Sequence, residues 1–251
     1  MERFEGRTVV VTGAGSGIGA ASVKRLLAEG ATVVAVDVTQ AGVDAAISSA
    51  ANSDRVHGAV LDVCDHDAAV GLLSEMGKEL GGLNGLINCA GITGEGSIVD
   101  TDQEKHRRIM AVNLDGTINM CQAFVLAVKD DTGPRAIVNI SSGAGILGVP
   151  NRLSYVASKF GISGITKSMS PELGPLGIRV NAVAPGMTRT PLIEYMMDDP
   201  AAVARINAKH PIGRIGDPEE IAAVIVFLLT DDASFMTGSV VSVDGGQTAC
   251  L

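Results

Sequence analysis

Hydrophobic runs alternate with stretches of helical periodicity along this chain. The β-branched run Thr8–Thr12 predicts a buried strand, and further strands are expected at 32–36, 56–61, 83–88, 136–140, 179–184 and 240–243. Between them, apolar residues recur at helical spacing at about 20–29, 40–50, 65–80 and 101–128, after Lys159, and at 217–229. Strands that alternate with helices are typical of a parallel sheet covered on both faces. The pattern predicts a single doubly wound α/β domain, residues 1–251.

Local signals mark where some of these helices begin. Thr101 and Glu104 have the spacing of a capping box, and Asp217 followed by Pro218 predicts another helix start. The only long stretch without a regular pattern lies between Pro185 and Asp217. We expect residues 186–216 to carry short helices over a site, because irregular segments of this length in a compact domain are often lids.

Composition narrows the classes of protein that fit. The 251 residues carry a formal net charge of −9, which disfavours nucleic acid and anionic lipid as partners. The basic cluster 105–108 is therefore interpreted as a solvated helix face. The longest strongly apolar run, Ile221–Leu229, is too short to span a bilayer, and residues 1–11 lack a signal-peptide pattern. Cys64, Cys89, Cys121 and Cys250 lack metal-ligand spacing, which predicts reduced thiols, no metal site and a cytoplasmic location.

A glycine-rich turn follows the first strand. In the segment 13–19, Gly13 permits a sharp exit from the strand, Gly17 lets the backbone approach a pyrophosphate, and Gly19 lets the helix pack on the sheet. The N-terminus of the next helix then presents N–H groups to the anion. A lone glycine triplet is common in other turns, but here the strand before it and the helix after it agree with a dinucleotide site.

Asp37 follows the second strand, eighteen residues after Gly19. A carboxylate there can accept hydrogen bonds from both adenosine ribose hydroxyls and repels the 2′-phosphate of NADP. Ser16 occupies a position in the turn where a cation would attract that phosphate. These features predict NAD as the cofactor, and the alternative for Asp37 is a solvated acid at a strand end.

Tyr155 and Lys159 are four residues apart, so they share one face of a helix. A nearby ammonium favours phenolate and lowers a tyrosine pKa from about 10 towards the range of a general base. Ser142 lies thirteen positions before Tyr155, after the strand at 136–140, and so at the edge of the sheet where ligands bind. Taken alone, such a Tyr–Lys pair also occurs by chance on surface helices.

Together these motifs resemble the short-chain dehydrogenase/reductase family over essentially the whole chain. Thr12-Gly13-x-x-x-Gly17-Ile18-Gly19 is similar to its cofactor signature, and Asn88-x-Ala90-Gly91 is similar to the segment after its fourth strand, although Cys89 stands where Asn is common. Asn113, Ser142, Tyr155 and Lys159 match the family's catalytic tetrad in order and approximate spacing. The resemblance implies a Rossmann fold with strand order 3-2-1-4-5-6-7, a dinucleotide-binding half at about 1–91, a catalytic half at about 92–251, and a homotetramer.

The resemblance also implies roles for individual residues. Tyr155 is the expected acid/base, Lys159 lowers its pKa and reaches the nicotinamide ribose, Ser142 bonds the substrate oxygen, and Asn113 anchors a relay water. Ser141 is the rival to Ser142. The remaining cofactor contacts expected are Ser16, Ile18, Asp62, Val63, Asn88, Ala90, Gly91, Pro185, Gly186, Thr188 and Thr190.

The sequence thus predicts an NAD-dependent oxidoreductase acting on a secondary alcohol or ketone. Alternatives are a 3-oxoacyl-thioester (acyl carrier protein) reductase and a catalytically silent NAD-binding sensor. Expected substrate residues are Gly143, Ile146, Val149, Arg152, Met187 and Arg214. We hypothesise that Arg152, with Arg214 as a second clamp, binds an anionic group such as the carboxylate of a sugar acid. The alternative is that both arginines pair with acids of the protein.

Overall fold

A seven-stranded parallel sheet forms the centre of the computed structural model, which describes residues 2–49, 53–196 and 198–249. Its strands are β1 (Thr8–Thr12), β2 (Thr32–Asp37), β3 (Val56–Val60), β4 (Gly85–Asn88), β5 (Arg135–Ile140), β6 (Ile178–Pro185) and β7 (Val240–Val243). They lie in the order β3-β2-β1-β4-β5-β6-β7, and each neighbouring pair is parallel. The predicted fold class and strand order are confirmed.

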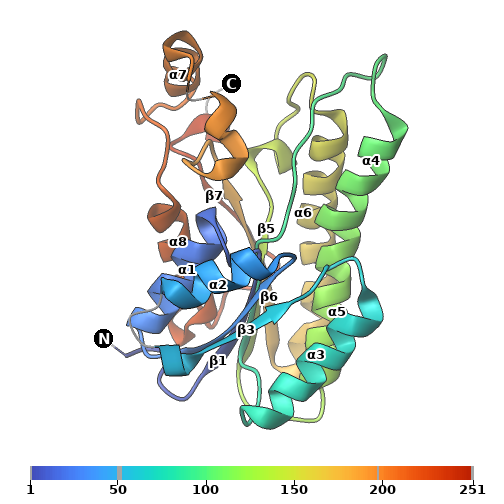
Figure 1. Cartoon of the computed structure of the whole chain (residues 1–251), viewed down its shortest axis with the longest axis vertical. Coiled ribbons are helices and arrows are strands. Elements are labelled where there is room, and N and C mark those ends of the chain that lie inside the picture. Colours follow the sequence, from blue (N-terminus) through green and yellow to red (C-terminus); the bar gives the residue numbers. More distant parts are fainter. Residues whose placement is uncertain (1, 50–52, 197, 250–251) are drawn as a thin grey trace.

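Helices cover both faces of the sheet (Figure 1). One layer holds α1 (Gly17–Ala28), α2 (Gln40–Ser48) and α8 (Pro218–Leu229); the other holds α3 (His66–Glu79), α4 (Gln103–Met110), α5 (Gly116–Val128) and α6 (Leu153–Leu173). Because side chains alternate along a strand, Val9 and Val11 of β1 join the core beside α1 and α8, whereas Val10 joins the core beside α3 and α5. The sheet is thus buried on both sides.

The strand register brings the carboxyl ends of the central strands together. Thr12 of β1 pairs with Asn88 of β4, which pairs with Asn139 of β5. The Thr12 hydroxyl accepts the N–H groups of Cys89 and Ala90, each at 3.1 Å, and so ties the segments that follow β1 and β4. The strand order reverses between β1 and β4, and open α/β sheets bind ligands at such a point.

Two helix starts differ from the sequence-based expectation. Helix α1 begins at Gly17 instead of at about residue 20, so the glycine turn itself forms its first turn. The predicted Thr101 cap is wrong: Asp102 caps α4 by accepting the N–H groups of Glu104 at 2.8 Å and Lys105 at 3.0 Å. Thr101 instead donates its hydroxyl to the carbonyl of Ser97 in the preceding turn.

The long helical region that was expected to reach residue 128 contains a π-helical turn, Ala111–Asp115. Contrary to the expectation that no segment could span a bilayer, Gln103–Val128 has the required length, and an 18-residue window within it has a mean hydropathy of 1.3. Half of the most hydrophobic part of this segment is buried inside the fold, as in the core helix of a soluble protein. Over the carboxyl ends of the strands, the predicted lid carries the 3₁₀ turn Pro191–Met196 and helix α7 (Pro200–Asn207).

Candidate functional site

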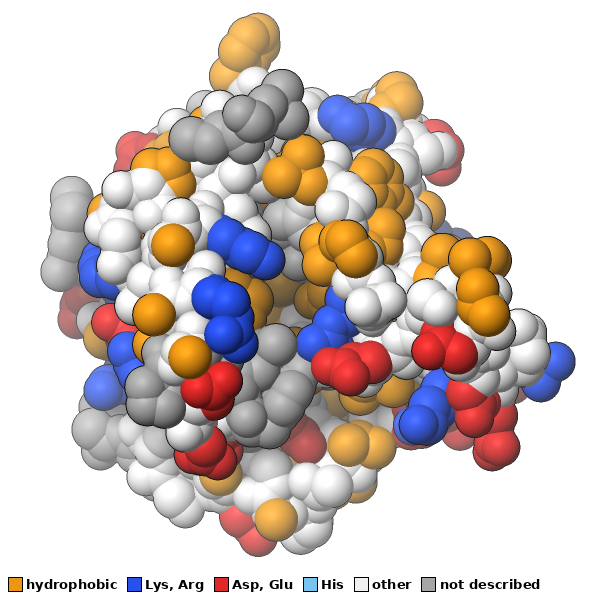
Figure 2. Space-filling model, turned by 90° about the horizontal axis from the view of Figure 1, so that it is seen from above, with side chains coloured by type: hydrophobic (Ala, Val, Ile, Leu, Met, Phe, Trp, Pro, Cys, Tyr) orange, Lys and Arg blue, Asp and Glu red, His pale blue; other side chains and the backbone are white. Residues whose placement is uncertain are grey.

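A cavity of about 720 Å³ lies along the carboxyl ends of the strands. Seen from above, the molecule is hollowed there, with hydrophobic side chains in the hollow and Lys and Arg side chains on both sides (Figure 2). The predicted residues that line it are Gly13, Ser16, Gly17, Ile18, Gly19, Asp37, Asp62, Val63, Ala90, Gly91, Ser142, Gly143, Val149, Arg152, Tyr155, Lys159, Pro185, Gly186, Met187, Thr188 and Thr190. Four other predicted residues, Asn88, Asn113, Ile146 and Arg214, do not line it.

The glycine turn forms a cradle at one end of the cavity. Gly13 and Gly17 have φ angles of +62° and +52°, and a Cβ at Gly19 would lie 2.0 Å from the carbonyl oxygen of Gly13. Ser16 precedes α1 without capping it through its side chain, so the first-turn N–H groups remain available to a ligand. A backbone this open at a helix N-terminus fits the pyrophosphate of a dinucleotide.

Asp37 stands at the next strand end, in the same cavity. One carboxylate oxygen accepts the N–H of Gly15 at 3.1 Å, and the other accepts the N–H and hydroxyl of Thr39, each at 3.2 Å. These bonds fix the carboxylate beside the glycine turn. A fixed carboxylate at this place fits the ribose hydroxyls of a dinucleotide.

Asp62 and Arg108 line the part of the cavity next to the end of β3. The N–H of Cys64 donates to Asp62 at 3.0 Å, and Arg108 donates at 3.4 Å; these contacts lower the pKa of the Asp62 carboxyl, the Cys64 bond contributing most. Arg108 lines the cavity, whereas its sequence cluster was interpreted as a solvated helix face. The Arg108 side chain is 53% exposed, so the solvated helix face is confirmed there, but its place in the cavity could not be predicted from the local spacing.

Tyr155 and Ser142 share a hydrogen bond at the other end of the cavity. Burial raises the pKa of the Tyr155 phenol, while the Ser142 bond and the positive charge of Arg152 oppose that rise. The Ser142 hydroxyl also accepts the N–H of Ala144 at 3.1 Å. Ser141, the rival serine, is buried and bonds to the Lys159 carbonyl at 3.1 Å and to Ser163 at 2.8 Å. Ser142 is therefore the serine within reach of Tyr155.

Lys159 lies beneath the tyrosine ring. Its ammonium donates to the carbonyl of Ile140 at 2.7 Å and lies 5.7 Å from the centre of the Tyr155 ring. Burial lowers the pKa of Lys159 to about 8. The expected lowering of the Tyr155 pKa is wrong for the protein without cofactor, because burial outweighs the opposing contributions of Ser142 and Arg152.

Asn113 is fully buried in the π-helical turn. Its side chain accepts the N–H of Ile92 at 2.8 Å and donates to the Ile92 carbonyl at 2.9 Å and to Ser158 at 3.0 Å. A Cβ at Gly91 would lie 3.3 Å from the Asn113 side-chain oxygen and 3.7 Å from the Lys159 nitrogen. Asn113 thus fixes the 91–92 segment next to Lys159.

Two predicted residues reach acids of the protein. Arg152 lines the cavity and donates to Glu95 at 3.1 Å. Arg214 bonds both carboxylate oxygens of Glu220, at 2.7 and 2.6 Å, and so joins the end of the lid to α8. The structure brings Arg152 to the site but leaves Arg214 outside it.

The cysteines show no sign of reactivity in the described ranges. Burial raises the pKa of Cys89 and of Cys121 to about 12, so both thiols are protonated at neutral pH. Cys250 lies outside the described residues. Within those residues, no group of three or more His, Cys, Asp or Glu side chains could hold a metal ion.

The chain is similar to known proteins over almost its whole length. The family model described as "Enoyl-(Acyl carrier protein) reductase" matches residues 13–248. A 3-oxoacyl-[acyl-carrier-protein] reductase of Thermotoga maritima is 40% identical over 97% of this chain and 98% of its own length. A cis-4-hydroxycyclohexanecarboxylate dehydrogenase of Sinomonas cyclohexanicum is 39% identical over 99% of each chain. The crystal structure of levodione reductase superposes with a TM-score of 0.93 at 35% identity, covering 99% of this chain and 100% of that one.

The chain belongs to the short-chain dehydrogenase/reductase family. This short-chain dehydrogenase/reductase is an oxidoreductase that acts on CH–OH groups with a nicotinamide cofactor. The glycine cradle, Asp37 and the Ser142–Tyr155 pair line the same cavity, so the residues present fit both the cofactor and the reaction.

Proposed function

We propose that the protein is an NAD-dependent dehydrogenase of secondary alcohols that also reduces the matching ketones. The observation that carries the proposal is one cavity with the glycine cradle and Asp37 at one end and Ser142, Tyr155 and Lys159 at the other. In this arrangement a dinucleotide would lie along the strand ends, and its nicotinamide would lie near the Tyr155 hydroxyl.

The chain's own residues move and hold the proton. NAD supplies the hydride acceptor when bound. The Tyr155 phenolate takes the proton of the substrate hydroxyl, and Ser142, bonded to Tyr155, holds the substrate oxygen in line. Lys159 passes the proton on while its bond to Ile140 fixes its position. Asn113 maintains the 91–92 segment next to Lys159.

Asp37 supports NAD over NADP. Its carboxylate is held in the cavity by Gly15 and Thr39, so a 2′-phosphate would be forced against a fixed negative charge. The cofactor contacts proposed with it are Asp62 and Val63, Ala90 and Gly91 behind the cofactor, and Pro185, Gly186, Thr188 and Thr190 at the end of β6 and after it. The buried Asn88 bonds to Asn139 and is not among them.

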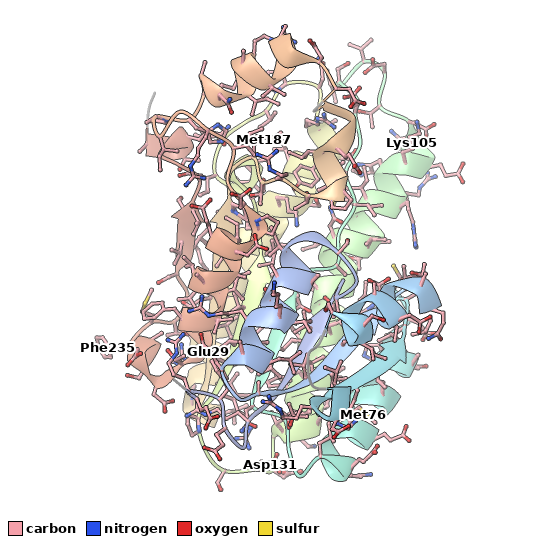
Figure 3. All side chains as sticks on the ribbon, turned by 60° about the vertical axis from the view of Figure 1, so that its left-hand side comes forward. Glu29, Met76, Lys105, Asp131, Met187 and Phe235 are labelled. Atoms are coloured by element: carbon pink, nitrogen blue, oxygen red, sulfur yellow. The ribbon has the colours of Figure 1, made fainter. Side chains whose placement is uncertain are left out.

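A hydroxy or keto acid is the substrate class we propose. The pocket beside Tyr155 is walled by Gly143, Val149, Met187 and the lid residue Ile193. Met187 lies below the lid at the upper end of the molecule (Figure 3). Relatives named for cis- and trans-4-hydroxycyclohexanecarboxylate, 39% and 35% identical, act on alcohols that carry a carboxylate.

A 3-oxoacyl-thioester reductase is the second candidate, and the Thermotoga maritima relative favours it. Asp37 argues against it where the reductase uses NADPH. A silent NAD-binding sensor would have no need of the Ser142–Tyr155–Lys159 arrangement. We place the protein in the cytoplasm, where its thiols remain reduced.

The deciding experiment is a screen of secondary alcohols, including hydroxy acids, with NAD and NADP, followed by absorbance of the reduced cofactor. We expect turnover with NAD and a higher kcat/KM for NAD than for NADP. Asp37→Ala should narrow that preference. A wild-type preference for NADP would reject the cofactor assignment, and activity confined to acyl thioesters would favour the second candidate.

A further inference from the structure

The segment before α6 holds Arg152 in an unusual backbone setting. Asn151 has a φ of +59° and is the one residue other than glycine with a positive φ in the described part of the chain. Gly96 donates its N–H to the Asn151 carbonyl, and its own carbonyl accepts the N–H of Leu153, both at 3.1 Å. Strain of this kind persists where the surrounding structure fixes it, and it is common at ligand sites.

The Arg152 side chain is mostly enclosed, with 16% of its surface exposed, yet it lines the cavity. Glu95, one of the groups that Arg152 contacts, is 70% exposed and does not line the cavity. The charge of Arg152 also reaches Tyr155, because it opposes the rise in the pKa of that phenol. The guanidinium is therefore close enough to the reacting hydroxyl for its charge to act on it.

Charged residues are distributed unevenly along the cavity. The acids that line it, Asp37 and Asp62, follow β2 and β3 at the cofactor end. The cations that line it are Arg108 beside Asp62, Lys159 beneath Tyr155, Arg152 before α6, and Lys209 in the lid after α7. Among the residues that the structure describes, no acid other than Asp37 and Asp62 lines the cavity, although the chain as a whole carries a charge of −9. A locally positive pocket in an acidic protein indicates an anionic ligand.

We propose that the substrate end of the cavity binds the anionic group of the alcohol substrate between Arg152 and Lys209. Arg152 bonds the anion bidentately, and Lys209 closes over it as part of the lid. Carboxylate, sulfonate and phosphate groups share this chemistry. Alcohols that carry one or another of these groups would show which anion the subsite prefers. The inference rests on the proposed dehydrogenase function.

The test compares a hydroxy acid with its own methyl ester. With the best hydroxy acid from the screen, we expect Arg152→Ala to raise KM about tenfold or more and Lys209→Ala to raise it several-fold. The KM for the ester and the KM for NAD should change little. Lys105→Ala is the matched control, because Lys105 is exposed on α4 and does not line the cavity.

Loss of the Arg152 charge also raises the pKa of Tyr155. Arg152→Ala should therefore shift the pH profile of kcat to higher pH, for the acid and the ester alike. The ratio of the two KM values isolates anion binding from that effect. Equal KM values for acid and ester in the wild type, or an unchanged ratio in both variants, would overturn the subsite. Absence of turnover with every alcohol would instead reject the proposed function, and calorimetric binding of the hydroxy acid to the wild type and Arg152→Ala would then test the subsite.

A separate observation concerns Gly42, in the first turn of α2. A Cβ at Gly42 would lie 2.4 Å from Cγ and from one carboxylate oxygen of Asp37, and 2.8 Å from the other. The three atoms nearest to that Cβ all belong to Asp37. Gly42 does not have a positive φ, so its backbone accepts alanine. The atoms that would have to move are those of the Asp37 carboxylate.

We infer that Gly42 is a positioning residue for cofactor choice. It leaves the space in which Gly15 and Thr39 hold the Asp37 carboxylate, and Gly15 itself packs so closely that a Cβ there would lie 2.5 Å from Gly42 Cα. A methyl group at position 42 displaces the carboxylate from its cradle while leaving the helix intact. The inference needs the dinucleotide site but not the substrate assignment.

Gly42→Ala separates positioning from stability. Alanine favours a helix by about 1 kcal/mol over glycine, so Tm should stay level or rise, while NADH affinity measured by fluorescence falls several-fold. The KM for NAD should rise with kcat unchanged, and the preference for NAD over NADP should narrow. Gly71→Ala is the control, because a Cβ at Gly71 meets nothing within 4 Å.

A double-mutant cycle keeps the idea testable if Gly42→Ala lowers Tm. In an Asp37→Ala background, Gly42→Ala should cause no further loss of NADH affinity, because the displaced group is gone. Unchanged NADH affinity in Gly42→Ala, or an equal additional loss in the Asp37→Ala background, would overturn the role of Gly42.

Discussion

At Tyr155, burial and charge act in opposite directions. Enclosure by the protein raises the pKa of the phenol, whereas Ser142 and Arg152 stabilise the phenolate. Lys159 shares the same enclosure and loses part of its own charge near pH 8. A general base whose pKa is held above the ordinary value is deprotonated more fully as pH rises, so alcohol oxidation should accelerate towards alkaline pH.

Replacing Tyr155 by Phe removes the group that accepts the substrate proton. We expect kcat for alcohol oxidation to fall by at least about 10²–10⁴. The glycine cradle and Asp37 are unchanged, so NADH should bind as in the wild type, which fluorescence titration would show. Turnover close to that of the wild type would mean that the proton leaves by another route.

The buried ammonium of Lys159 predicts a pH-dependent stability. Its pKa is about 8 in the folded protein and about 10.4 in the unfolded chain, so between these values the unfolded state binds more protons. The free energy of unfolding should therefore rise with pH across this range, relative to the Lys159→Met variant, by roughly 1 kcal/mol per pH unit. Urea denaturation of both proteins from pH 7 to 10 measures the difference. A difference in unfolding free energy between the two proteins that does not change with pH would contradict the lowered pKa of Lys159.

At the scale of elements, the region from α4 to α5 shows how one side chain sets a helix start. Asp102 accepts two first-turn N–H groups, and the Ser97 carbonyl, four residues before Thr101, accepts the Thr101 hydroxyl. The π-helical turn that follows places Asn113 against the segment after β4. The cap and the turn together position the wall of the cavity near Lys159.

The cap makes a simple stability prediction. Asp102→Ala should lower the free energy of unfolding by about 1 kcal/mol, because two N–H groups lose their acceptor. Glu104→Ala, at the position that the sequence pattern assigned to a capping box, should have a smaller effect. Urea denaturation of both variants compares them, and a larger loss for Glu104→Ala would restore the sequence-based interpretation.

At the scale of the whole molecule, apolar surface remains on the outer elements. Phe160 on α6 is 45% exposed and Ile118 on α5 is 40% exposed. Phe235, near the start of β7, is fully exposed, and β7 forms one edge of the sheet. Figure 3 shows Phe235 pointing away from the body of the protein. Exposed aromatic side chains and a free strand edge indicate contacts between subunits.

We therefore expect a homotetramer in solution, as the family resemblance implied. Light scattering at micromolar concentration should give the mass of four chains, and Phe160→Glu should shift the protein to a smaller species. Lys105→Glu, a change at an exposed polar position, serves as the control. A stable monomer in the wild type would reject the prediction.

Local chemistry was enough to determine much of this protein from its sequence. Buried β-branched runs and the glycine turn depend on close neighbours in the sequence, so the fold could be predicted, as could the place of the glycine turn and Asp37 in one cavity. Tyr155 and Lys159 share a helix, and their pairing needs only the helical period.

Tertiary packing decided those features of the site in which segments far apart in the sequence meet. Only the fold shows that Arg108 and Lys209 reach the cavity while Arg214 is bonded to Glu220. It also raises the pKa of Tyr155 instead of lowering it, because the cost of burying a charge depends on how many distant elements enclose it. The contact between Gly42 and Asp37 arises in the same way, since a turn, a strand end and a helix start meet at one point that no spacing in the sequence records.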